Sequence, residues 1–162
     1  MSPHRLLLLI LLIVLIVASV GTMSQTIPPD RDGLEKGEGM GMGMYGEING
    51  YPGPKHVLEL KDSLHLSPEQ ISKTQRIFDE MAQQSVALGG SIISMEEKLN
   101  NAFRSHNLSE ESLLALSTSI GQLRGQLRAV HLRARLLTRE VLTDEQLSLY
   151  MHFRGHTQHG HH

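Results

Sequence analysis

Apolar residues recur at helical spacing through the middle of the chain, from about residue 67 to residue 103. One series repeats every seven positions, and a second series fills the partner positions. The two series are Ile71, Phe78, Ser85, Ile92 and Leu99, then Met81, Leu88, Met95 and Ala102. This pattern predicts a long amphipathic helix with an apolar seam of the coiled-coil type. Gly89-Gly90 interrupts the pattern, so we expect a bend or a close helix crossing there.

A second apolar run predicts another long helix over residues 109–141. Its seam contains no polar residue and consists of Leu113, Leu116, Ile120, Leu123, Leu127, Val130, Ala134, Leu137 and Val141. Two helices of about 50 Å joined by a short turn at residues 105–108 must pack antiparallel. The sequence therefore predicts an all-α fold, a long bent antiparallel helical hairpin. One hairpin leaves apolar surface exposed, so we expect a homodimer.

Two similar helix starts frame this hairpin, Leu66-Ser67-Pro68-Glu69-Gln70 and Leu142-Thr143-Asp144-Glu145-Gln146. In each, the hydroxyl can cap the helix, and the Gln side chain can reach back to the backbone N–H of the capping residue. The second start predicts a last helix over about 143–153, and a short amphipathic helix precedes the first start at about 55–64. The predicted helical hairpin domain is therefore 54–154.

The first third of the chain has a different composition. Arg5 precedes an unbroken apolar run that ends in small residues, so residues 1–21 are predicted to be a signal peptide or a membrane anchor. Either places the rest outside the cytoplasm. Residues 22–53 contain alternating Gly and Met and are predicted to be a flexible linker. Its Met residues offer thioethers to a soft ion such as Cu(I), although a merely flexible linker explains them too.

Composition excludes several classes of protein. The 162 residues contain no Cys and no Trp and carry a formal net charge of −2. There is thus no disulfide framework or thiolate site, and a nucleic-acid partner is not indicated. No Ser-His-Asp context, paired catalytic carboxylates or phosphate loop is present, so we expect no enzyme activity, no catalytic residues and no organic cofactor.

The paired Leu-Ser/Thr-x-x-Gln signatures on an exported, Cys-free helical chain resemble one group of periplasmic proteins. This group contains the Spy/CpxP-type chaperones and the CnrX/ZraP-type heavy-metal-resistance proteins. Gly39-Met40-Gly41, followed by the stretch from Glu47 to Leu60, also resembles members identified as periplasmic heavy-metal sensors. The resemblance covers about residues 39–155. It implies a non-enzymatic dimer shaped like a cradle, which either holds unfolded clients or binds metal and reports envelope stress to a membrane partner.

The resemblance also implies a metal site. A His on the second long helix corresponds to His131, although the position four residues later, where the relatives have Met or His, is Arg135, which donates no lone pair. An N-terminal His corresponds to His56. Glu59 lies one turn from His56, and Glu80 lies near the level of His131 in an antiparallel hairpin. Imidazole and carboxylate ligands suit a divalent ion, Zn, Ni, Co or Cu. Otherwise His131 is a flanking residue hydrogen-bonded to a neighbour.

Two further groups of residues carry candidate chemistry. The C-terminal tail, 155–162, is His-rich and can chelate divalent metal weakly, unless it is an added purification tag; its candidate ligands are His156, His159, His161 and His162. The second long helix has a basic flank that can contact unfolded clients, or that simply forms a solvated, ion-paired face. The candidate client-binding residues are Arg124, Arg128, Arg133 and Arg135.

The leading hypothesis from the sequence is a periplasmic, heavy-metal-responsive binding or sensor protein involved in metal resistance or envelope stress. The alternative is an ATP-independent periplasmic chaperone of the Spy/CpxP type. A third hypothesis is a structural helical dimer tethered to the inner membrane by its N-terminal segment.

Overall fold

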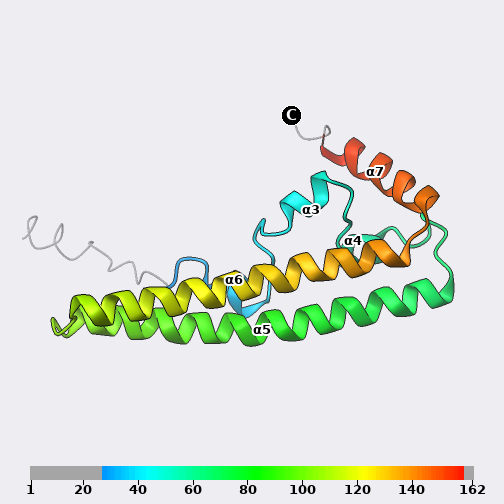
Figure 1. The fold of residues 1–162 in the computed structure, drawn as a ribbon. Coiled ribbons are helices and arrows are strands. Elements are labelled where there is room, and N and C mark those ends of the chain that lie inside the picture. The colour runs from blue at the N-terminus through cyan, green and yellow to red at the C-terminus, as the bar shows by residue number, and fades with distance from the viewer. Residues whose placement is uncertain (1–26, 159–162) are drawn as a thin grey trace, which may run out of the picture.

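The computed structural model describes residues 27–158, and this part of the chain is all-helical. Two long helices, α5 (Pro68–Arg104) and α6 (Glu110–Val141), lie side by side as an antiparallel rod (Figure 1). Four shorter helices accompany them: α2 (Arg31–Glu35), α3 (Met44–Ile48), α4 (Pro54–Glu59) and α7 (Asp144–Gln158). The predicted helical hairpin with short N- and C-terminal helices is confirmed.

The predicted seams form the contact between α5 and α6. Ile92 and Leu127 are fully buried, and the seam positions Ser85, Ile120 and Ala134 are buried as well. Apolar side chains at these positions leave water together, which is the main favourable contribution to helix packing. Within the described residues, no helix has the length and apolar character needed to cross a membrane.

A second apolar cluster closes the open end of the hairpin, where α4 and α7 lie (Figure 1). Its buried members are Val57, Leu64, Leu66, Leu142 and Tyr150. The cluster joins the segment just before α5 to the segment just after α6. The start of α5 and the end of α6 are therefore fixed to the same core. Through Val57, the short helix α4 covers this end of the hairpin.

The two capping sequences meet in this closed end. Ser67 Oγ accepts a hydrogen bond from the Gln70 N–H at 3.2 Å, and the Ser67 N–H donates to Gln70 Oε1 at 3.0 Å, which completes a capping box. Thr143 and Gln146 repeat this arrangement at α7. The two Gln side chains also bond each other: Gln70 Nε2 donates to Gln146 Oε1 at 2.8 Å, and Gln146 Nε2 donates to Gln70 Oε1 at 3.2 Å.

The segment predicted to be a flexible linker differs from that prediction over its described part, residues 27–53. It folds into α2 and α3 and runs along the hairpin (Figure 1). Leu34 of α2 is fully buried against Ile92, Ile93 and Leu127. The physical reason lies in Gly89 of α5, where the lack of a side chain lets the Leu34 backbone approach. The crossing expected at Gly89-Gly90 is therefore a crossing of α5 by α2.

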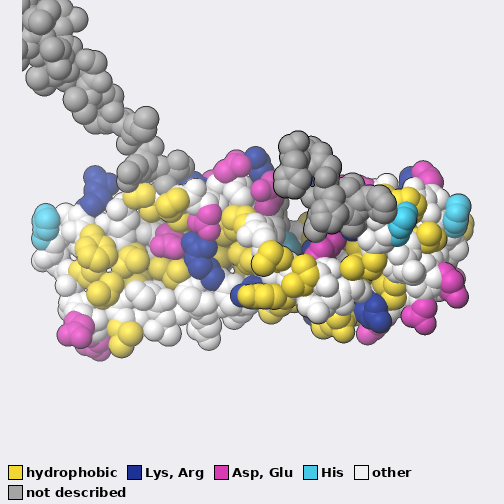
Figure 2. Space-filling model, turned by 90° about the horizontal axis from the view of Figure 1, so that it is seen from above, with side chains coloured by type: hydrophobic (Ala, Val, Ile, Leu, Met, Phe, Trp, Pro, Cys, Tyr) yellow, Lys and Arg dark blue, Asp and Glu magenta, His cyan; other side chains and the backbone are white. Residues whose placement is uncertain are grey.

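The opposite end of the rod, at the α5–α6 turn, carries exposed apolar side chains. Figure 2 shows apolar surface over this end, at the left of the view. Phe103 is 56% exposed and Leu114 is 68% exposed. Such a surface is compatible with association, but the homodimer stays a prediction.

Candidate metal-binding cavity

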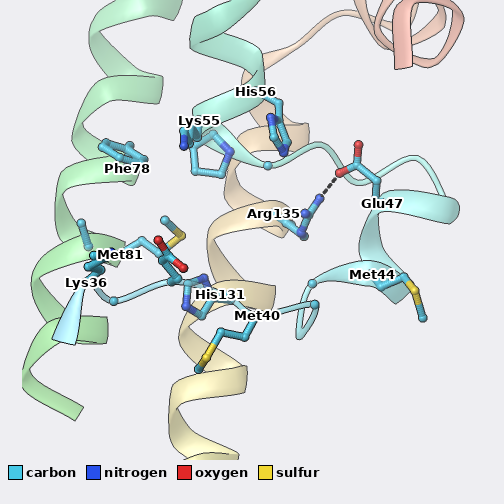
Figure 3. A pocket seen from close by; sticks show the side chains of 18 of the residues that line it. Lys36, Met40, Met44, Glu47, Lys55, His56, Phe78, Met81, His131 and Arg135 are labelled. Atoms are coloured by element: carbon cyan, nitrogen blue, oxygen red, sulfur yellow. Dashed lines mark hydrogen bonds and ion pairs between the residues drawn. The ribbon is translucent and has the colours of Figure 1, made fainter. Parts of the chain in front are cut away.

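A cavity of about 530 Å³ lies between the residue 36–48 segment, α4 and the hairpin. Its wall includes side chains from four parts of the chain: His131 of α6, Met81 of α5, His56 of α4 and Met40 of the Gly/Met segment (Figure 3). The cavity exists because α2 and α3 hold the Gly/Met segment against the hairpin. A truly mobile linker would leave this part of the α5–α6 surface open.

His131 is the buried titratable group of the cavity, with 8% of its surface exposed. Its Nε2 lies 3.2 Å from Oγ of Ser85, which is itself fully buried in the seam of α5. Burial, and then the nearby Arg135 charge, lower the pKa of the imidazole below its ordinary value. The ring is therefore neutral at neutral pH, which is the form that can donate a lone pair to a metal ion.

His56 faces the same cavity from α4 and is more accessible, with 32% of its side chain exposed. Its Nδ1 lies 3.0 Å from Glu59 Oε2. Figure 3 shows Arg135 between the imidazoles of His56 and His131. The two rings therefore share one cavity, but a guanidinium group stands between them in this conformation.

Arg135 is held by Glu47 of α3, and this ion pair ties α3 to α6. Glu47 Oε1 also accepts hydrogen bonds from Tyr150 Oη at 2.7 Å and from Arg154 Nε at 3.0 Å, so α7 joins the same cluster. Burial raises the pKa of Glu47, but the bonds from Tyr150, Arg135 and Arg154 outweigh it and lower the pKa below its ordinary value. Glu47 is thus a carboxylate, and it offsets part of the positive charge beside His131.

The structure brings together part of the predicted metal set. His56 and His131 border one cavity, and Glu59 is a hydrogen-bond partner of His56. Glu80 does not border this cavity; it lies among Ile77, Leu137 and neighbouring residues on another face of the hairpin. The predicted tail ligands are not placed: the His156 side chain and residues 159–162 lie outside the described part of the chain.

The predicted client-binding arginines have different surroundings. Arg124 donates to Asp30 at 2.6 Å and to Glu96 at 2.9 Å. The hydrogen bond to Asp30 is the main cause that raises the pKa of Arg124, against the effect of burial. Arg128 stacks over the Tyr45 ring at 5.4 Å, and Arg133 is exposed. The basic flank is therefore used partly to hold the N-terminal segment on the hairpin.

Three residues of the cavity and its support were not singled out as ligands or partners from the sequence: Glu47, Met81 and Ser85. Met40 was considered there only as one of several thioethers of the Gly/Met stretch. Ser85 carried a signal, since it is the one polar residue among the two predicted seam series of the first long helix. Met81 also belongs to a predicted seam, so its heptad position explained it as core. No pattern in the sequence predicts the contact between Glu47 and Arg135, because this contact depends on how the segment between α2 and α4 folds back onto α6.

The donor atoms can be compared with what a metal ion requires. Within residues 27–158, no group of three or more His, Asp or Glu side chains is arranged to hold an ion. The His131 cavity does contain thioethers in addition to its imidazoles, from Met40, Met44 and Met81. The described residues thus place imidazole and thioether groups, nitrogen and sulfur donors, around one cavity.

The fold and cavity define a class: an all-helical hairpin protein whose N-terminal segment encloses a cavity lined by imidazole and thioether groups. A family model described as heavy-metal resistance matches residues 5–147, and the chain belongs to this family. The match confirms the resemblance to heavy-metal-resistance proteins drawn from the sequence. No curated protein and no solved structure matches the chain.

Proposed function

We propose that the protein is a periplasmic, heavy-metal-responsive binding protein that binds its ion in the His131 cavity. The observation that supports this most is the convergence of His56 and His131 from separate elements on one cavity, in a chain of the heavy-metal-resistance family. The predicted leader at residues 1–21, which would export the chain, lies outside the described residues.

The proposed response follows from binding linkage. A ligand that contacts both the N-terminal segment and α6 favours the conformation in which they are docked, by its difference in affinity for the docked and undocked states. The Glu47 cluster joins α3, α6 and α7, so docking is coupled to the position of α7. A change in this region is what a membrane signalling partner would read.

The arrangement favours this function over the chaperone alternative. Two of the four candidate client-binding residues, Arg124 and Arg135, are bonded to carboxylates of the same chain. Arg128 is stacked on Tyr45. Charged side chains that already have partners gain less from a client, because the existing contacts must first be broken.

Thermal unfolding in the presence of metal ions tests the proposal. The protein is prepared with His156→Ala, His159→Ala, His161→Ala and His162→Ala as a common background, so that the tail cannot bind. An ion bound only by the folded state at about 100 times its Kd adds about 2.7 kcal/mol of stability and raises the Tm. We expect such a rise with at least one heavy-metal ion from a panel of Zn, Ni, Co, Cu and Ag.

The matched variants are His131→Asn and His106→Asn. His106 is exposed at the α5–α6 turn, remote from the cavity, so its variant controls for loss of an imidazole elsewhere. The metal-dependent rise in Tm should be lost in His131→Asn and kept in His106→Asn. A flat response of the background protein to every ion would refute the proposed function.

A further inference from the structure

We propose that the ion of this cavity is soft and monovalent, Cu(I) or Ag(I), held by the thioethers of Met40 and Met81 and by Nδ1 of His131. The inference rests on the proposed function and narrows it to a class of ion. It adds two sulfur ligands from the Gly/Met segment and from α5, neither of which belongs to the predicted His and Glu set.

The first step is the orientation of His131. Ser85 Oγ lies 3.2 Å from Nε2, and a hydroxyl oxygen can accept the Nε2–H bond. In the tautomer that we propose, Nε2 carries the proton and the lone pair of the neutral ring is on Nδ1. Among the described residues, Nδ1 has no hydrogen-bond partner. An oxygen that fixes one ring nitrogen and leaves the other for the ion is the usual support of a metal-binding histidine.

The second step is the space beside Nδ1. Gly39 is its neighbour, and a Cβ at that position would stand 3.3 Å from Nδ1, closer than ordinary van der Waals contact. The same Cβ would stand 3.4 Å from Cε1 and 3.6 Å from Cγ, so glycine lets the backbone of the Gly/Met segment pack closely against the face of the ring. The next residue, Met40, has a backbone φ of 40°, a conformation that residues other than glycine rarely adopt. Backbone strain of this kind gathers at ligand sites, where the surrounding structure maintains it.

The third step is the supply of sulfur. Met40 and Met81 border the same cavity as His131, and Figure 3 shows both beside the His131 ring. The other two methionines of the Gly/Met segment are placed differently. Met42 packs against the apolar cluster of α2, α5 and α6, and Met44 points away from His131 in Figure 3. Thioether ligands select Cu(I) over the harder divalent ions.

The fourth step is charge. The cavity wall has four cationic side chains, Lys36, Lys55, Arg135 and Arg154, against two carboxylates, Glu38 and Glu47. Repulsion of an ion scales with the charge of the ion, so a divalent ion is disfavoured about twice as much as a monovalent one at the same distance. Neutral sulfur and imidazole ligands also suit a monovalent ion, because no carboxylate is needed to balance its charge.

Ag(I), which needs no reductant, is the probe. The full chain with the four tail histidines replaced by Ala is titrated with silver nitrate in chloride-free buffer by isothermal calorimetry, and NMR follows the methionine methyl groups. We expect one ion per chain, with shifts of the Met40 and Met81 methyl signals. Met40→Leu and Met81→Leu should each weaken binding by about tenfold or more, and Ser85→Ala by roughly tenfold.

Met42→Leu is the matched control, since it removes a thioether of the same segment that packs in the apolar cluster. Its affinity for Ag(I) should be unchanged. Equal Ag(I) affinity in the background protein and in the double Met40→Leu, Met81→Leu variant would overturn the inference. Circular dichroism confirms that each variant keeps its helices.

Zinc distinguishes failure of this inference from failure of the proposed function. Binding of Zn(II) that requires His131, without specific binding of Ag(I), would leave the proposed function intact and refute the soft-ion site. Binding of neither ion, nor of Ni, Co or Cu, would refute both. Stronger binding of Ag(I) than of Zn(II), dependent on Met40 and Met81, supports both.

Discussion

Gly89 lies where the carbonyl group of Leu34 contacts the surface of α5. A Cβ at position 89 would stand 2.1 Å from the Leu34 oxygen, and that oxygen belongs to backbone, which cannot rotate away as a side chain can. Gly90, the next residue, has nothing within 4 Å of its own Cβ position. The two adjacent glycines therefore have opposite roles, one permitting a close approach and one only weakening the helix.

We predict opposite effects of alanine at these two positions. Gly89→Ala should lower the free energy of unfolding by about 1–3 kcal/mol, because the added methyl group displaces α2. Gly90→Ala should raise it by about 0.5–1 kcal/mol, because alanine favours a helix interior. Urea denaturation followed by circular dichroism measures both. Equal effects of the two variants would contradict the close packing of α2 on α5.

The paired Gln residues act at the scale of helices, because they join the start of α5 to the start of α7. Gln70 Nε2 also donates to the carbonyl oxygen of Val141 at 2.8 Å, and Gln146 Nε2 donates to that of Leu64 at 3.2 Å. Each side chain thus caps its own helix and also satisfies a backbone carbonyl group, that of Val141 at the end of α6 or that of Leu64 in the turn before α5. The repeated signature in the sequence describes one structural unit with two halves.

Alanine substitution tests this coupling between helices. Gln70→Ala and Gln146→Ala should each lower the free energy of unfolding by about 1–3 kcal/mol, because their partners are left without hydrogen bonds. The double variant should lose less than the sum, with a coupling energy of about 0.5–3 kcal/mol. Gln75→Ala is the control, since Gln75 is exposed and bonds only Asp79 within α5; its effect should stay within about 0.5 kcal/mol. Additive losses would show that the two Gln side chains do not act together.

At the scale of the whole molecule, the hairpin and its end helices could be predicted because they depend on periodicity and capping, which are local in the sequence. The two seams predicted the α5–α6 contact, and the two caps predicted where α5 and α7 begin. The fold of residues 27–53 could not be predicted in this way. Its glycines have the composition of a flexible chain, and only the surface provided by Gly89 and the partners of Glu47 make it ordered.

The site shows the same division. His56 and His131 were predicted from the resemblance, and the structure places both on one cavity. Met40 and Glu47 reach that cavity only through the fold of the N-terminal segment, so a one-dimensional pattern could not bring them there. Glu80 was predicted because it lies at the same height along the hairpin as His131. Height along a helix does not determine which face a side chain occupies, and Glu80 is on another face of the hairpin.

The docking of the N-terminal segment onto the hairpin makes the stability of the molecule depend on pH in two windows. The pKa of His131 is lowered from its ordinary 6.5 by burial and by Arg135, so below about pH 6.5 the unfolded chain takes up a proton that the folded chain does not. The free energy of unfolding therefore falls as the pH falls through this window. Glu47 has a pKa lowered from 4.5, so its contribution is present above that pH and is lost as the pH falls through its folded pKa.

We predict two separate losses of stability when urea denaturation is repeated from about pH 8 down to about pH 3. His131→Asn should remove most of the loss in the upper window and leave the lower one. Glu47→Gln should lower stability at neutral pH, because Arg135 and Arg154 lose the Glu47 carboxylate. It should also reduce the loss in the lower window, where Asp30 has a lowered pKa as well. Hydrogen exchange at neutral pH should show faster exchange of α3 in Glu47→Gln, while the middle of α5 stays protected. An unchanged upper window in His131→Asn would mean that the buried imidazole does not control the docked state.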